Sequence, residues 1–363
     1  MKVVVTGADG FLGWHVRARL KALTDYQVVA MGRHNWAQLD DHVADADAVI
    51  HLAGVNRGSD DEVEQGNTSL ARELVDAVHR TAARPRIVYA NSIQSGNGTP
   101  YGNGKEAAAS ILREAAGSLG GECVDVRLPN LFGEHGRPRY NSFVATFVHA
   151  VVAGETPTVT DREVPLLHAQ RAAQVLIDAL DGPTSVVEPK GTPTTVRDVL
   201  ETLQGFNRLY AEGDVPALTS DFDVDLFNTL RAARFPEHYP IPLVPRSDDR
   251  GRLVEVVRAH AGQGQTFVST TKPGITRGEH FHLRKVERFV VVSGTARISL
   301  RKVLTDEVVS FDVSGESPVI VDMPTMWAHN ITNTGTSELT TLFWTNELFD
   351  PAAPDTFPEP VGR

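Results

Sequence analysis

The chain has 363 residues, 41% of them hydrophobic and 22% charged, so it is long enough for about two domains and too apolar for a disordered chain. Its 35 basic and 46 acidic residues give a net charge of −11, which disfavours nucleic acid and anionic membrane surfaces as partners. The single cysteine, Cys123, cannot form an intramolecular disulfide. No apolar run approaches the ~18 residues of a membrane span, and the start is unlike a signal peptide, so we expect a cytoplasmic protein.

The first two thirds of the chain alternate short β-branched runs with longer stretches of helical period. This alternation predicts a doubly wound, Rossmann-like parallel sheet with crossover helices. The expected strands are residues 3–5, 28–31, 49–52, 87–90 and 123–126.

A composition change follows, because four prolines at positions 236, 240, 242 and 245 can continue neither a helix nor a central strand. We place a linker there and expect one domain over residues 1–243 and another over 244–363. The second domain shows short strands without helices, which predicts a small all-β barrel. Its expected strands are residues 253–258, 266–270, 288–293, 296–300, 308–313, 319–322 and 339–344.

A glycine-rich turn joins the first strand to the first helix. Gly7 permits a tight turn, Gly10 lets the backbone approach a pyrophosphate at the helix N-terminus, and Gly13 lets helix and strand pack closely. The second strand is followed by Arg33, where an NAD enzyme usually has a carboxylate for the ribose 2′-hydroxyl. Because an arginine can pair with a 2′-phosphate, NADPH is the expected cofactor; an ordinary surface arginine is the alternative.

A tyrosine and a lysine four residues apart open a later helix and therefore lie on one face of it, at Tyr101 and Lys105. A phenol exchanges a proton at neutral pH only when a nearby cation favours the phenolate, and Lys105 supplies that cation. Ser92, at the end of the preceding strand, is placed to bond the substrate oxygen, with Ser95 as its rival.

These motifs resemble the extended short-chain dehydrogenase/reductases that act on nucleotide sugars. TGxxGFLG at residues 6–13, HLAG at 51–54, YxxxK at 101–105 and LPNLFG at 128–133 occur in the family's order. Ser92 and Tyr101 are only nine residues apart, where most of the family has a longer insertion. The resemblance implies a catalytic set of Ser92, Tyr101 and Lys105. It also implies cofactor contacts from Gly7, Gly10, Phe11, Leu12, Gly13, Arg33, Leu52, Ala53, Gly54, Tyr101 and Lys105, and substrate contacts from Asn130, Arg137 and Asn141.

A second group of residues has the composition of a metal site. His280 and His282 are two apart, so in a strand they share a face; Glu287 can return on the neighbouring strand, and His329 can complete the set from a third. Three imidazoles and one carboxylate suit a divalent ion, zinc first, then iron, nickel or manganese. The alternative is a set of ordinary core histidines.

The spacing of these residues resembles the two motifs of the cupins, with Met326 where a glycine is usual. Residues 277–281 also resemble the sugar 3,5-epimerases, metal-free barrels in which the histidine at the place of His280 acts as a base. A histidine that ligates a metal cannot also be that base. We therefore name Lys272 and Arg277 as candidate base and enolate partner, and leave open whether the metal is structural or catalytic.

Together the two halves resemble the bifunctional enzymes of capsular polysaccharide precursor synthesis, over essentially the whole chain. The resemblance implies that the barrel epimerises a UDP-4-keto-6-deoxy-N-acetylhexosamine at carbon 3. The first domain then reduces carbon 4 with NADPH, toward UDP-6-deoxytalosamine and N-acetylfucosamine. A homodimer is expected. Two alternatives remain, an NAD-dependent nucleotide-sugar epimerase or dehydratase whose barrel is only a dimerisation module, and a binding protein that senses NADPH without turnover.

Overall fold

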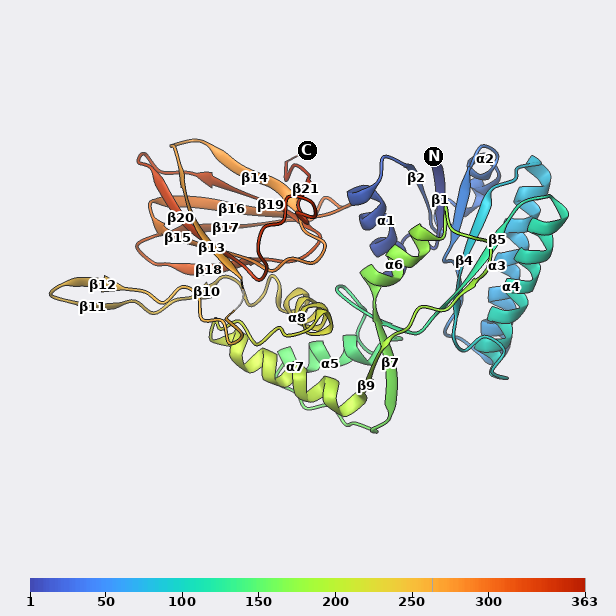
Figure 1. Cartoon of the computed structure of the whole chain (residues 1–363), viewed down its shortest axis with the longest axis horizontal. Helices are drawn as coiled ribbons and strands as arrows, with labels where there is room; N and C mark the ends of the chain where they lie inside the picture. The colour runs from blue at the N-terminus through green and yellow to red at the C-terminus, as the bar shows by residue number, and fades with distance from the viewer. Residues whose placement is uncertain (263, 363) are drawn as a thin grey trace. The chain divides into compact units, whose positions relative to one another are not determined.

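The structure is a computed structural model that describes residues 1–262 and 264–362 (Figure 1). Its described residues form two compact units that do not divide the chain at a single point. Unit 1 consists of Met1–Phe132, Tyr140–Ser142 and Glu163–Thr194, and unit 2 consists of Gly133–Arg139, Phe143–Arg162 and Thr195–Arg363. No described helix is long and apolar enough to cross a membrane.

Unit 1 is built on a six-stranded sheet in the order β2-β1-β3-β4-β5-β8, with every strand pair parallel. Its inner strands are continuous apolar runs because both faces of the sheet are covered, and Val3, Val4 and Val5 are fully buried. The strands are β1 (Lys2–Thr6), β2 (Gln27–Met31), β3 (Ala48–His51), β4 (Arg86–Ser92), β5 (Cys123–Leu128) and β8 (Val186–Val187). A smaller sheet contains β6 (Asn130–Phe132), β7 (Glu163–His168) and β9 (Thr192–Thr195).

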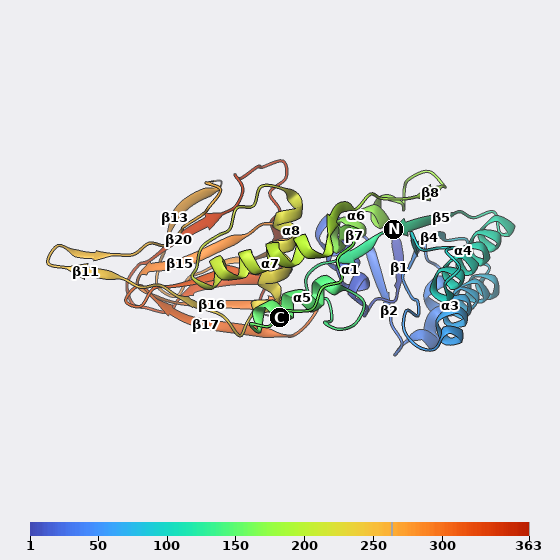
Figure 2. The same cartoon turned by 90° about the horizontal axis from the view of Figure 1, so that it is seen from below.

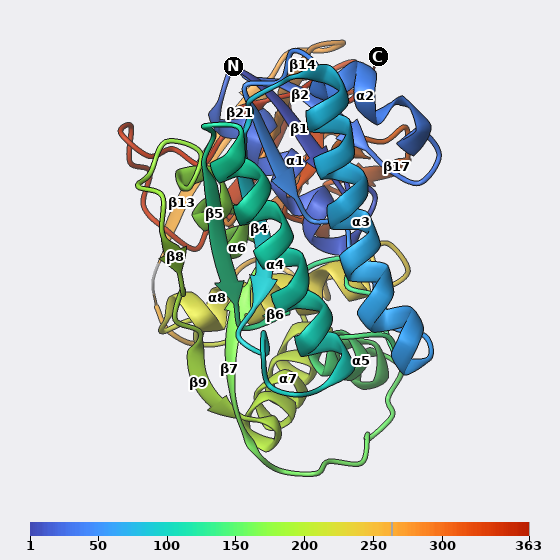
Figure 3. The same cartoon turned by 90° about the vertical axis from the view of Figure 1, so that its right-hand side faces the viewer.

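Helices cover both faces of the large sheet, each over its own hydrophobic cluster (Figure 3). One face carries η1 (Trp36–Gln38), α2 (Leu39–Val43), α3 (Asp60–Thr81) and α4 (Pro100–Ser118); the other carries α1 (Phe11–Leu23) and α6 (Ala169–Asp178). The sequence fixes where these helices begin: Ser59 and Glu62 form a capping box on α3, and Thr99 caps α4 just before Pro100.

Unit 2 contains a barrel of two five-stranded sheets (Figure 2). The first sheet, in spatial order, is β10 (Ile241–Pro242), β18 (Val319–Met323), β15 (Glu287–Ser293), β20 (Leu339–Thr345) and β13 (Gln265–Thr271). The second is β17 (Val308–Ser314), β16 (Thr295–Lys302), β19 (Trp327–Asn333), β14 (Thr276–Phe281) and β21 (Phe357–Pro358). All these pairings are antiparallel. A hairpin of β11 (Arg246–Asp248) and β12 (Gly251–Leu253) projects from the barrel.

Three helices belong to unit 2 as well, α5 (Phe143–Val152), α7 (Val196–Ala211) and α8 (Asp221–Arg234). A buried ion pair ties α7 to the barrel. The guanidinium of Arg288 donates to the carboxylate of Asp322 over 2.8 and 3.0 Å, and neither side chain is exposed. The Tyr210 hydroxyl, on α7, donates to the same carboxylate over 2.8 Å, and Arg288 also donates to the carbonyl of Gly213 just beyond α7. The charges are therefore fully hydrogen-bonded, as buried ions must be.

The predicted fold class is confirmed, a parallel α/β sheet followed by an all-β barrel. The strand expected at 253–258 is wrong, because β12 ends at Leu253. The proline-rich segment is also not a free linker throughout: Ile241 and Pro242 form β10, and Tyr239 is buried. Proline is tolerated in β10 because this strand is the edge of its sheet. The boundary at 243/244 stays a prediction.

Candidate functional site

The glycine-rich turn forms a tight cradle between β1 and α1. Gly7 has a φ of 65°, and a Cβ added there would lie 2.8 Å from the backbone nitrogen of Ala53. A Cβ on Gly13 would lie 2.2 Å from the Gly7 carbonyl oxygen, so helix and turn touch through this glycine. Gly10 is the N-cap of α1; in the described part of the chain no side chain caps that helix, and its first turn holds no acidic residue. An uncapped helix N-terminus behind a glycine turn fits the pyrophosphate of a dinucleotide.

Two charged residues of opposite sign flank the end of β2. Arg33 follows Gly32 and is exposed, as a contact to a ribose phosphate would require. The carboxylate of Asp9 lies against Gly32, where an added Cβ would be 1.9 Å from its Oδ2 atom, and it is 3.3 Å from the Nδ1 of His34. Asp9 was not predicted from the sequence, because its approach to β2 is set by the turn and not by spacing along one strand.

Ser92 lies at the carboxyl end of β4, and Tyr101 and Lys105 lie at the start of α4. Ser95 accepts a hydrogen bond from Asn91 over 3.2 Å. Burial raises the pKa of the Tyr101 phenol, and the Ser92 side chain opposes this shift. The phenol is therefore protonated at neutral pH, which is the form that a proton donor needs.

Lys105 is buried among groups that hold it in one place. Its ammonium donates to the Ala90 carbonyl over 2.9 Å and lies 4.8 Å above the centre of the Tyr89 ring. Burial lowers the pKa of Lys105 to about 8, against the attraction of the buried Asp125 carboxylate. Lys105 is therefore charged at neutral pH, and it lies one helical turn from Tyr101 along α4.

The loop after β3 is held by a buried hydroxyl. Thr6 Oγ1 accepts the backbone N–H groups of Leu52 and Ala53, each over 3.2 Å, so its own proton is free to be donated to the Nδ1 of His51, 2.8 Å away. Burial and the nearby Lys105 charge lower the pKa of His51 to about 3, so this imidazole is neutral. These contacts fix residues 52–54 beside Gly7, where the cofactor was predicted to lie.

The predicted substrate residues lie in different surroundings. Asn130 begins β6 and donates to the Pro165 carbonyl over 3.4 Å, and Arg137 is exposed in unit 2. The Asn141 side chain accepts a hydrogen bond from Arg57 over 3.2 Å, and the Arg57 guanidinium lies 4.8 Å from the Tyr140 ring centre. The contact of Arg57 with Asn141 was not predicted from the sequence, since 84 residues separate the two.

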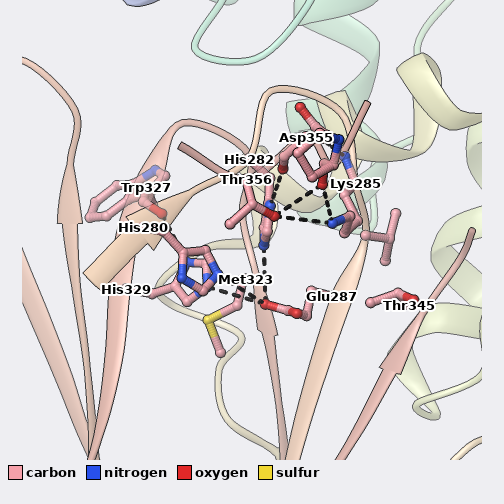
Figure 4. A network of polar contacts seen from close by, with 12 residues as sticks. His280, His282, Lys285, Glu287, Met323, Trp327, His329, Thr345, Asp355 and Thr356 are labelled. Carbon is pink, nitrogen blue, oxygen red and sulfur yellow. Dashed lines mark hydrogen bonds and ion pairs between the residues drawn. The ribbon is translucent and has the colours of Figure 1, made fainter. Parts of the chain in front are cut away.

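In the barrel, His280, His282, Glu287 and His329 come together (Figure 4). One potential ligand atom from each lies within 4.8 Å of all the others. Glu287 Oε2 is 3.1 Å from the Nε2 of His282, 3.2 Å from that of His329 and 3.9 Å from that of His280. The four residues are thus close enough to bind one ion, and their three nitrogens and one oxygen suit a divalent metal such as zinc.

The route by which these side chains meet differs from the prediction. β14 pairs with β19, which carries His329, and with β21; Glu287 begins β15 in the opposite sheet. The expectation that Glu287 returns on the strand next to His280 is therefore wrong. His282 lies just beyond β14, and a register irregularity separates Gly278 from His280. Packing of two sheets, which periodicity within one strand does not reveal, brings the set together.

The orientation of two imidazoles suits metal binding. His282 Nδ1 donates to the Asp355 carbonyl over 2.5 Å, and His329 Nδ1 donates to the Trp327 carbonyl over 3.1 Å. With the proton on Nδ1, each Nε2 presents its lone pair to the cluster. Burial lowers the pKa of His280 to about 3, with His329 and His282 adding to the effect. Burial would raise the pKa of Glu287, but His282 and His329 hold it well below its usual value.

Three other predicted positions belong to the same barrel. Met326 has a φ of 61°, in the region where glycine is favoured, and its backbone N–H donates to the His282 carbonyl over 2.7 Å. Arg277 pairs with Ile331 on β19, two residues beyond His329, so it lies on the face of β14 that the cluster occupies. Lys272 is exposed in the turn between β13 and β14.

The fold and the two groups of side chains define a dinucleotide-dependent enzyme joined to a cupin-type barrel. Residues 3–190 match the NAD dependent epimerase/dehydratase family, and the chain belongs to it. Residues 246–357 match the polysaccharide biosynthesis C-terminal domain.

Similarity to individual proteins extends over the whole chain. It is 33% identical over 372 residues to UDP-2-acetamido-2,6-beta-L-arabino-hexul-4-ose reductase of Pseudomonas aeruginosa, covering 100% of both chains. Among solved structures it is similar to the capsular polysaccharide assembling protein CapF from Staphylococcus aureus, with 34% identity, a TM-score of 0.65, and coverage of 99% of this chain and 100% of that one. UDP-N-acetylglucosamine 4-epimerase from Bacillus cereus shares the fold over 57% of this chain and 82% of its own, with 22% identity and a TM-score of 0.50. The predicted family resemblance is confirmed.

Proposed function

We propose that the chain is a cytoplasmic, homodimeric enzyme of capsule-type polysaccharide precursor synthesis with two activities. The barrel epimerises a UDP-4-keto-6-deoxy-N-acetylhexosamine at carbon 3, and unit 1 reduces its 4-keto group with NADPH. The observation that carries this proposal is the presence in one chain of a Tyr101–Ser92–Lys105 set beside a glycine cradle and of a separate histidine cluster in a barrel. The printed names of the reductase relative and of CapF support it.

The reduction uses a proton donor that burial keeps protonated. Tyr101 donates its phenolic proton to the ketone oxygen while Ser92 bonds the same oxygen. The charge of Lys105, four residues along α4, would stabilise the phenolate that forms. The cradle of Gly7, Gly10 and Gly13 would hold the dinucleotide, which supplies hydride to carbon 4 when bound. Arg33 would select NADPH by pairing with its 2′-phosphate.

The epimerisation depends on the acidity that the 4-keto group gives to the hydrogen on carbon 3. A base removes this proton from one face, and the enolate is reprotonated on the other, so no redox partner is needed. We assign Lys272 as base and Arg277 as partner of the enolate oxygen. His280, His282, Glu287 and His329 would hold the divalent ion, zinc first, which can polarise a carbonyl or stabilise the barrel.

The two activities can be separated by isotope labelling. The protein is incubated with the 4-keto sugar nucleotide in deuterated water, with and without NADPH. We expect deuterium at carbon 3 without NADPH, and NADPH oxidation once it is added. Tyr101→Phe should slow NADPH oxidation by about 10²–10⁴-fold and leave labelling unchanged. If the wild type shows neither deuterium at carbon 3 nor NADPH oxidation, the proposal is refuted.

A second candidate is an NAD-dependent epimerase or dehydratase with a non-catalytic barrel. The carboxylate of Asp9 beside Gly32 favours it, because a carboxylate at the end of β2 suits the ribose 2′-hydroxyl of NAD. Purified protein that carries oxidised NAD through gel filtration supports this candidate. If instead Arg33→Ala weakens NADPH binding far more than NADH binding, and Asp9→Asn does not weaken NADH binding, NADPH is the cofactor.

A further inference from the structure

The C-terminal residues 354–361, here called the strap, lie along the segment that carries two of the clustered histidines. Within the strap, β21 pairs with β14, so that Phe357 lies opposite Phe281 and Pro358 opposite His280. The strap therefore contacts the histidine segment along its length, although more than 70 residues separate them in sequence.

Asp355 binds this segment with both its side chain and its backbone (Figure 4). Its carboxylate accepts the backbone N–H groups of Leu283, Arg284 and Lys285 over 3.1, 3.0 and 2.7 Å. Its carbonyl accepts the Nδ1–H of His282 over 2.5 Å. Asp355 has a φ of 42°, which asparagine and aspartate adopt more readily than other side chains. One residue thus holds the loop directly after His282 and the His282 ring itself.

The strap also holds the other end of the histidine segment. Glu279 precedes His280 at the register irregularity and has a φ of 61°. Its carbonyl accepts the N–H of Glu359 over 2.8 Å, and its carboxylate accepts the N–H of Val361 over 2.6 Å and the amide of Asn330 over 2.8 Å. These contacts stabilise the backbone turn that points His280 toward His329.

A buried arginine fixes the strap to the barrel. Arg301, on β16, is 2% exposed; it donates to the Glu359 carboxylate over 2.5 Å and to the carbonyls of Pro360 and Val361 over 2.7 and 3.1 Å. Lys285 adds a bond to the Pro354 carbonyl over 2.6 Å. Both ends of the strap are therefore anchored, so it acts as a rigid support rather than as a frayed terminus.

We propose that the strap is a positioning element of the metal centre and that Asp355 is its principal positioning residue. The inference rests on the metal site of the proposed function. Because the Asp355 carbonyl accepts the Nδ1 proton, His282 keeps its lone pair on Nε2 and its ring stays directed at Glu287. By thermodynamic reciprocity, a bound ion must in turn stabilise the docked strap.

Cobalt(II) binding to the full-length protein tests the proposal, with visible absorption as readout of both affinity and coordination geometry. Asp355→Ala keeps the backbone carbonyl that accepts the His282 proton but removes the carboxylate that holds this carbonyl in place against residues 283–285. We expect it to weaken Co²⁺ binding by about 10–100-fold and to alter the spectrum, as loss of a group supporting a ligand does. Asp355→Asn, which tolerates the same φ and keeps one acceptor oxygen, should recover part of the affinity. Asp350→Ala is the control, because among the described residues the Asp350 carboxylate accepts only the N–H of Ala352, in its own turn.

Hydrogen exchange of backbone amides in the wild type tests the same proposal without a variant, so it still gives an answer if Asp355→Ala fails to fold. With metal added after chelation, the amides of residues 283–285, 359 and 361 should exchange at least about tenfold more slowly, while those of β17 change little. A wild type that binds no Co²⁺ refutes the metal site itself. A wild type that binds Co²⁺ without protecting the strap, or an Asp355→Ala protein with unchanged affinity and spectrum, refutes the positioning role alone.

Discussion

Gly13→Ala tests the packing on which the dinucleotide cradle depends. The added Cβ would lie 2.2 Å from the Gly7 carbonyl oxygen and 2.8 Å from the Cα of Ala8, whereas real Cβ atoms essentially never come within 3.0 Å of another atom. Both clashes are with backbone, so no side chain can move aside. The turn and α1 must therefore separate by about 0.8 Å.

Such overpacking costs about 1–3 kcal/mol of unfolding free energy. A misplacement of about 1 Å can lower the rate of a reaction between positioned groups by a factor of about 100. We therefore expect a displacement of this size in the cradle to lower the affinity for the dinucleotide at least tenfold. Urea unfolding and fluorescence titration with NADPH measure the two effects.

Gly117→Ala is the matched control, since Gly117 lies in α4 with nothing within 4 Å of an added Cβ. Alanine there should stabilise the protein by about 0.5–1 kcal/mol and leave binding unchanged. If Gly13→Ala binds NADPH as the wild type does, at undiminished stability, the cradle does not work through this contact.

Three further predictions concern titration and strain. Because burial lowers the pKa of Lys105 to about 8, kcat/KM for ketone reduction should decline as pH rises through 8; a flat profile to pH 9 would contradict its role. His51 has its pKa lowered to about 3, so the unfolded state takes up a proton below pH 6.5 that the folded state refuses. Its share of stability, full above pH 6.5, should fall by about 1.4 kcal/mol per pH unit toward pH 3. Urea unfolding of His51→Asn should show a slope smaller by one proton. Met326→Gly relieves the strain of a φ of 61°, about 1–3 kcal/mol, but removes a fully buried side chain that contributes about 2–5 kcal/mol to stability. We expect calorimetry to show a net loss of stability. A gain would show that the backbone strain is the larger effect.

Short-range patterns carried most of what the sequence could predict. The parallel strands are apolar runs, and the glycine turn and the Tyr101–Lys105 pair each depend on a few neighbouring residues, so their signals are local. The four clustered barrel residues were named from spacing, yet the assignment of Glu287 to the strand next to His280 failed. Spacing identifies side chains with a common chemistry, but it does not determine which sheet each strand joins.

Contacts between segments that are distant in the sequence could not be predicted from it. Asp355 and Arg57 meet their partners across 73 and 84 residues, and both are ordinary polar residues in irregular segments without a periodic pattern. Asp9 illustrates the same limit at short range, because only the turn geometry shows that its carboxylate lies against Gly32.

The buried Arg288–Asp322 pair has a consequence for anyone who wants to produce the barrel separately. A fragment that starts at residue 244 lacks Tyr210 and Gly213, two of the groups that satisfy this pair, and would open it to solvent on that side. An expression fragment or a chimera that begins near residue 195 keeps α7 and α8, and with them both groups, but it still lacks α5, which also belongs to unit 2.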